Sequence, residues 1–208
     1  FISGITAEDR CHLNGLALEN EEPRYVTLLG KTDTLQGWRE KKASGGCLID
    51  IRTNEVIADT LPMPHSPRLY NGKLYVLLSA TGELAEVDQK KKTYKIVKQL
   101  DGFARGMDRI GDYVFIGLSK LRQTSTTFAD LPIAKRSVFC GIVVMHLPTT
   151  SITGFIKYEN SVEEIYDVKV LPGMQRPGIL NHEKPDFRMA ISTPEKTFWG
   201  QPHENDKA

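Results

Sequence analysis

Hydrophobic and polar residues alternate over short stretches along most of the chain, and turn-forming residues separate these stretches. The clearest unit starts at His65, where a first strand leads into the turn Asn71-Gly72. The strands expected after this turn are 73–78, 83–88 and 93–99. Asn-Gly between two β-rich stretches is a strong hairpin signal. The pattern therefore predicts a sheet of antiparallel strands joined by close turns.

The same order of strands and turns recurs along the chain as a weak internal repeat. Successive units begin at His12, His65, Arg105 and Glu163. The spacing from His65 to Arg105 lies within the ~40–50 residues of a propeller blade, and the longer spacings leave room for loop insertions. Short strands without helical periodicity favour an all-β radial array. We therefore predict a β-propeller of four-stranded antiparallel blades, with an ordinary β-sandwich as the alternative.

The expected blades occupy residues 1–178, and a polar, turn-rich extension occupies residues 179–208. This extension is expected to be partly disordered. The blade region has room for about three complete units and the start of another. Closure of a propeller removes its exposed sheet edges, and the chain begins at Phe1 rather than Met. We therefore expect further blades N-terminal to Phe1, or assembly with another copy.

Composition and charge narrow the range of partners. The chain is 40% hydrophobic and 25% charged, which is ordinary for a globular protein. A net charge of +1 provides no field that attracts nucleic acid. The one basic run, Lys90-Lys91-Lys92, falls at an expected hairpin tip and is interpreted as a solvated turn. No apolar run approaches the ~20 residues of a membrane span. We expect neither a nucleic-acid nor a membrane partner.

The cysteines indicate a reducing compartment. There are 3 of them, and none belongs to a C-x-x-C pair, so a disulfide framework and a thiolate zinc site are both disfavoured. Cys47 and Cys140 each adjoin a glycine at the start of an apolar strand and are expected to be buried thiols. The N-terminus has no charged and apolar regions of a signal peptide. We expect a cytoplasmic protein.

Polar residues recur at the unit starts, which in a propeller line one mouth of the central channel. They are His12, Asn14, His65, Ser66, Arg68, Arg105, Glu163, Glu164 and Asp167. Convergent polar groups in a concave site are the default hypothesis for a binding site. Trp38 and Arg39 lie in a long loop and are expected to cap a ligand there, the alternative being a loop pinned by one buried tryptophan.

One chemistry that suits this set is metal binding. The imidazoles of His12 and His65 with the carboxylate of Glu163 or Glu164 are candidate ligands for a divalent metal such as zinc, iron or manganese. We name His12, His65 and Glu163 as the candidate catalytic residues. A histidine hydrogen-bonded within the fold is the structural alternative for each imidazole.

The other chemistry is anion binding. Arg68 and Arg105 would clamp an anionic group by bidentate hydrogen bonds, with a histidine as general acid or base. Both arginines have a structural alternative, which is pairing with Glu163 and Glu164. We expect a small polar or anionic molecule to be bound or converted at the channel mouth. A non-catalytic scaffold for a protein partner is the alternative function.

Several short motifs together resemble one known family. They span residues 12–17, 32–34, 37–40, 64–68, 82–84, 103–106, 117–120 and 163–168. The family they resemble is the propeller-like domain of unknown function DUF4915, and the resemblance runs from about His12 to Pro177. It implies a propeller fold and no activity. The blade pattern is more distantly similar to the gluconolactonase and strictosidine-synthase-like propellers, but their ligand set is not cleanly reproduced here.

Overall fold

The computed structural model describes residues 2–121, 128–160, 162–175, 177, 190–192 and 197–199. The chain divides into two compact units, Phe1–Val170 and Leu171–Ala208, whereas the sequence pattern placed this division after residue 178. In the second unit, β13 (Ala190–Ser192) pairs with β14 (Thr197–Trp199). The rest of the expected extension from residue 179 lies outside the described residues. All predicted site residues belong to the first unit.

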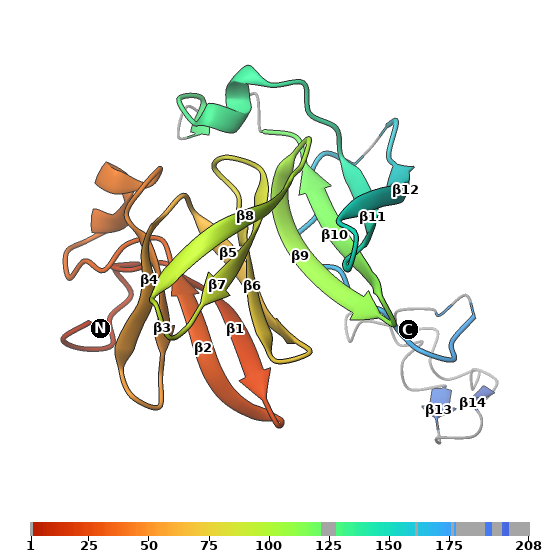
Figure 1. Ribbon diagram of the computed structural model, residues 1–208, viewed down its shortest axis with the longest axis horizontal. Coiled ribbons are helices and arrows are strands. Elements are labelled where there is room, and N and C mark those ends of the chain that lie inside the picture. Colours follow the sequence, from red (N-terminus) through yellow and green to blue (C-terminus); the bar gives the residue numbers. More distant parts are fainter. Residues whose placement is uncertain are drawn as a thin grey trace, which may run out of the picture. The chain divides into compact units, whose positions relative to one another are not determined.

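The first unit contains three sheets, each of four antiparallel strands consecutive in sequence, which follow one another in chain order in Figure 1. Blade 1 consists of β1 (Leu13–Glu19), β2 (Glu22–Leu28), β3 (Gly46–Asp50) and β4 (Glu55–Leu61). Blade 2 consists of β5 (Pro64–Tyr70), β6 (Lys73–Leu78), β7 (Glu83–Asp88) and β8 (Thr93–Gln99). Blade 3 consists of β9 (Phe103–Ile110), β10 (Tyr113–Ser119), β11 (Gly141–His146) and β12 (Ser151–Lys157). The predicted fold, blades of a β-propeller, is confirmed.

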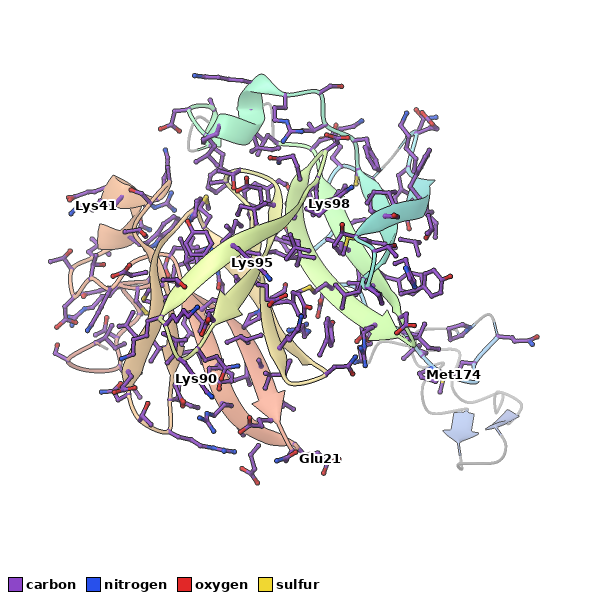
Figure 2. All side chains as sticks on the ribbon, viewed as in Figure 1. Glu21, Lys41, Lys90, Lys95, Lys98 and Met174 are labelled. Atoms are coloured by element: carbon purple, nitrogen blue, oxygen red, sulfur yellow. The ribbon has the colours of Figure 1, made fainter. Side chains whose placement is uncertain are left out.

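Local turn chemistry accounts for the hairpins. At the β5–β6 turn, Asn71 and Gly72 have φ values of 51° and 74°. A two-residue turn with positive φ at both positions matches the right-handed twist of its strands, and Asn-Gly adopts it with little strain. The run Lys90-Lys91-Lys92 lies in the exposed β7–β8 turn, as predicted. Figure 2 shows Lys90 together with Lys95 and Lys98 of the outer strand β8.

Blade 2 is buried on both faces. Leu74 and Val76 of β6 share an apolar cluster with Tyr25 of blade 1. Leu77 packs on the opposite face, in a cluster that contains Met107 of blade 3. Because successive side chains of a strand point to opposite faces, β6 contributes to both clusters. This explains why its sequence is an unbroken apolar run rather than an alternating one.

The innermost strands of the blades are neighbours, since β1 contacts β5 and β5 contacts β9. The Asn14 side chain of β1 donates to the Pro64 carbonyl at 3.0 Å. The backbone N–H of Gly106 in β9 donates to Ser66 Oγ at 2.9 Å. These contacts bring the starts of the three inner strands to one end of the unit.

The segment 163–170, expected to open a fourth blade, lies beside β9 and forms no strand. Its backbone groups bond to loop and side-chain atoms instead of to a neighbouring strand. The Glu163 carbonyl accepts from the Lys120 N–H at 2.9 Å, and the Ile165 N–H donates to Ser119 Oγ at 2.8 Å. The segment therefore lies beside β9 at Gly106 and Asp108, but its hydrogen bonding is not that of a sheet.

Two long loops cover the end of the unit at which the inner strands begin (Figure 1). Within them are the short 3-10 helices η1 (Gly37–Lys41) and η3 (Pro132–Lys135). Trp38 and Ile133 from these helices share an apolar cluster with Leu29, Met63 and Phe103. No helix in the described part of the chain is long and apolar enough to cross a membrane. The covered end, with its loops, is where the candidate site lies.

Candidate functional site

A pocket with a cavity volume of about 300 Å³ lies among the starts of the inner strands and the two long loops. Its lining residues are His12, Leu29, Trp38, Arg39, Met63, His65, Phe103, Arg105, Ser119, Lys120, Leu121, Phe128 and Glu164. Most of the predicted site residues are therefore in one cavity: two histidines, two arginines, the loop tryptophan and one glutamate. The volume is at the lower end of the range for small-molecule sites.

His65 is held by hydrogen bonds that assign its tautomer. Its Nδ1 lies 3.0 Å from the Met63 carbonyl and 2.7 Å from Ser79 Oγ. The Ser79 hydroxyl donates to the Ala104 carbonyl at 2.6 Å, so its oxygen is left to accept. Because both neighbours of Nδ1 are acceptors, Nδ1 carries the proton and Nε2 keeps its lone pair.

Burial makes His65 a neutral imidazole. It lowers the pKa of His65 to about 3, and the nearby Arg105 guanidinium acts in the same direction. The hydrogen bond to the Met63 carbonyl opposes the shift but does not outweigh it. His65 therefore stays uncharged near neutral pH, with Nε2 as a hydrogen-bond acceptor.

His12 is oriented by a carboxylate that was not predicted. Its Nδ1 lies 3.0 Å from both carboxylate oxygens of Asp9. Asp9 Oδ2 also accepts the Trp38 indole N–H at 2.9 Å. The imidazole and indole ring centroids are 4.7 Å apart. Asp9 thus favours the tautomer with the proton on Nδ1, which leaves Nε2 of His12 available to a ligand.

Arg105 is flanked by aromatic rings and paired with a carboxylate. Its Nη2 donates to Glu164 Oε2 at 3.1 Å. Its Cζ lies 4.3 Å from the ring centroid of Tyr166 and 5.4 Å from that of Phe103. Its Nε is buried without a hydrogen-bond partner among the described residues. The rings hold the guanidinium plane in place.

Two further cations give the pocket an excess of positive charge. Arg39 is exposed and lies with its Cζ 4.6 Å from the ring centroid of Trp38. Lys120 follows the end of β10. Trp38 itself is only 2% exposed, so it both pins its loop and lines the pocket. Glu164 is the one carboxylate among the described lining residues.

A second hollow receives the other predicted residues except Glu163. It has a volume of about 230 Å³ and is lined by Asn14, Gly15, Leu16, Ser66, Arg68, Tyr166 and Asp167. Arg68 donates from Nε to the Met107 carbonyl at 3.1 Å and from Nη1 to the Leu16 carbonyl at 3.3 Å. Its Nη2 lies 3.6 Å from Asp167 Oδ1. These bonds join the three inner strands, so Arg68 acts between blades and is not placed with Arg105.

The sequence matches the family described as a domain of unknown function, DUF4915, over residues 1–180. The chain belongs to this family. The resemblance drawn from the short motifs is thereby confirmed. No curated protein matches the chain in sequence.

Solved structures with a similar arrangement have low sequence identity to this DUF4915 member. The computationally designed Ika4 protein has a TM-score of 0.47 and 9% identity, over 82% of this chain and 84% of its own. The Neurospora crassa Pan2 WD40 domain has a TM-score of 0.40 and 16% identity, over 70% of this chain and 40% of its own. The chain thus spans less than half of the Pan2 domain.

Of the metal ligands suggested for this DUF4915 chain, His12, His65 and Glu164 line the pocket and Glu163 does not. Glu163 is exposed and lines neither hollow, whereas its neighbour Glu164 lines the pocket. Adjacent residues of an extended segment point to opposite sides, so only one of the two faces the cavity. Within the described ranges, no group of three histidine, cysteine, aspartate or glutamate residues is arranged to hold a metal ion.

Sequence reasoning missed several residues that shape this site. Asp9 and Ser79 fix the two histidines but have no distinguishing pattern around them. Lys120 ends the motif 117–120, one of those that carried the family resemblance, and this was a usable signal. The apolar wall that includes Phe103 and Phe128 comes from a strand start and a loop. Apolar residues at such positions are usually read as core.

Proposed function

We propose that this pocket binds a small anionic molecule at the channel mouth of the propeller. The observation that carries the proposal is the charge of the lining: Arg39, Arg105 and Lys120 face one carboxylate, Glu164. Guanidinium groups present fixed forks of N–H donors that match carboxylates and phosphates. Partial enclosure strengthens such contacts, because charges interact more strongly away from bulk water.

The two histidines would orient the ligand in the pocket. Neutral His65 offers Nε2 as a fixed acceptor for a hydroxyl or amide of the ligand. The Asp9 carboxylate orients His12 and leaves its Nε2 available to a ligand, so His12 is the better candidate for a general acid or base. Asp9 would then be a positioning residue. Conversion of the ligand would be general acid–base chemistry centred on His12.

The experiment that tests this function is calorimetric titration with phenyl phosphate and inorganic phosphate as probes. Arg105→Lys keeps the charge but loses the fork, so it should weaken binding of these probes by about 1–3 kcal/mol. The matched control is Arg109→Lys. Arg109 also stacks on a tyrosine, Tyr70, but lines a different hollow. Unchanged binding in Arg105→Lys would remove Arg105 from the site, and equal weakening in both variants would indicate a nonspecific charge effect.

A further inference from the structure

Besides its cations, the pocket has an apolar and aromatic wall. Leu29 and Met63 are each 1% exposed and Phe103 is 5% exposed, so they form a firm floor. Leu121 and Phe128 are partly buried and pack against the same cluster. A wholly polar anion would gain nothing from the apolar part of this wall that faces the cavity.

The aromatic rings of this wall are in contact with one another. The ring centroids of His65 and Phe103 are 5.9 Å apart in an edge-to-face arrangement, with an angle of 69° between planes. Phe103 and Phe128 are also 5.9 Å apart, tilted by 38°. Contacts of this kind hold each ring in a defined orientation. The pocket therefore presents flat aromatic surfaces in fixed directions beside the aliphatic side chains of Leu29 and Met63.

The cations lie immediately beside these rings. The Cζ of Arg105 is 5.4 Å from the centroid of Phe103, and the Cζ of Arg39 is 4.6 Å from that of Trp38. A ligand that contacts a guanidinium and the adjacent ring together must have its charge close to its apolar body. A cavity of about 300 Å³ has room for one or two rings but not for a long chain.

We infer that the ligand is a ring-bearing anion, with a carboxylate or phosphate attached at or next to a flat unsaturated ring. This inference rests on the proposed function and specifies its substrate class. It narrows the expectation drawn from the polar unit starts, which was a small polar or anionic molecule. The unit starts supply the charged groups, while the wall that would contact the body comes from Met63 before β5, Phe103 and the long loops.

The test compares three carboxylates of equal charge: benzoate, cyclohexanecarboxylate and acetate, titrated into the full chain by calorimetry or ligand-observed NMR. Benzoate should bind at least about tenfold more tightly than acetate, because a ring buries its apolar surface. It should also bind more tightly than cyclohexanecarboxylate, which is apolar but not flat. Equal affinity of benzoate and cyclohexanecarboxylate would overturn the flat ring, and equal affinity of benzoate and acetate would overturn the apolar body.

Those two outcomes leave anion binding intact, whereas failure of all three carboxylates and of phenyl phosphate to bind would overturn the proposed function itself.

Variants of phenylalanine residues test whether the preference for benzoate comes from this wall. Phe103→Leu keeps an apolar side chain but removes the ring, and should reduce the benzoate-to-acetate affinity ratio severalfold. Phe128→Leu, at a partly buried position, should act in the same direction if Phe103→Leu does not fold. Phe155→Leu is the control, since Phe155 is 65% exposed on β12 and outside the pocket. An unchanged ratio in both pocket variants would overturn the assignment to this wall.

Discussion

The two histidines of the pocket differ in the group that holds Nδ1. In His65 the partners are a carbonyl and a hydroxyl, which are neutral, and the ring is buried. In His12 the partner is the Asp9 carboxylate, and the ring is partly exposed. Burial in apolar surroundings disfavours a charged imidazolium. Two residues of one type are therefore held differently, His65 as a buried neutral acceptor and His12 by a carboxylate at a partly exposed position.

The depressed pKa of His65 links folding stability to pH. Its ordinary pKa is 6.5, and burial lowers the folded value to about 3. The unfolded chain therefore takes up a proton first as the pH falls, so the stability from neutral His65 is present above about pH 6.5 and is lost as the pH falls toward 3. Between about pH 7 and pH 4 the free energy of unfolding should fall by on the order of 1–3 kcal/mol more in the natural chain than in His65→Asn.

Urea unfolding at a series of pH values measures this difference. The asparagine amide can still donate to the Met63 carbonyl, and it does not titrate. His146→Asn is the control, because His146 lies on β11 outside the pocket and bonds to Thr149. If the natural chain and His65→Asn lose stability in parallel as the pH falls, His65 is not the group responsible.

Among the elements, the segment 163–170 is decisive for the site, since it brings Glu164 and Tyr166 to Arg105. Its place depends on close approach to β9 at Gly106, where φ is 74°. A Cβ at this glycine would overlap the backbone of Asp167. A side chain at position 106 would therefore move one wall of the pocket.

Gly106→Ala and Gly111→Ala form a matched pair that tests this packing. Both glycines have positive φ, but a Cβ at Gly111 would meet nothing within 4 Å. Both variants should lose roughly 1 kcal/mol of stability through left-handed strain. Gly106→Ala should lose a further ~1–3 kcal/mol through overpacking, and it should also weaken phenyl phosphate binding. Equal unfolding midpoints and equal affinities in the two variants would contradict the wall assignment.

Prediction at the element level succeeded where the signal is local. The strands 73–78, 83–88 and 93–99 were placed as the structure has them, because alternation and Asn-Gly turn chemistry depend on neighbouring residues. The segment from Glu163 has the same local pattern, but it forms no strand in the described residues. Whether an extended segment joins a sheet depends on a hydrogen-bonding neighbour, and here Ser119 and Asp108 bond its backbone instead.

At the scale of the whole first unit, blade 2 couples the other two blades. Its side chains belong to the apolar cluster shared with blade 1 and to the one shared with blade 3. A loss of packing at one boundary between blades therefore destabilises the whole unit. We expect the three blades to unfold together.

Leu77→Ala tests this cooperativity. Leu77 is fully buried against blade 3, and its truncation should reduce the free energy of unfolding by about 2–5 kcal/mol. In a Trp199→Phe background, Trp38 is the remaining tryptophan and reports on the loop of blade 1. Its fluorescence and far-UV circular dichroism should shift to the same lower urea midpoint. Ile96→Ala, at a site 45% exposed on β8, should change stability far less. Separate midpoints for the two signals would contradict one cooperative unit.

The sequence by itself determined the blades, their order and the family, because strand alternation, turn residues and short motifs are local properties of the chain. It also determined which positions are polar at the unit starts. Only the tertiary structure decided how these residues are divided between two hollows. Arg68 binds carbonyls of neighbouring blades and so lies outside the pocket. Glu164, and not Glu163, lines the pocket. Asp9, which lies before β1, orients His12. Strand twist, blade packing and loop placement set those directions, and each depends on contacts between residues far apart in the sequence.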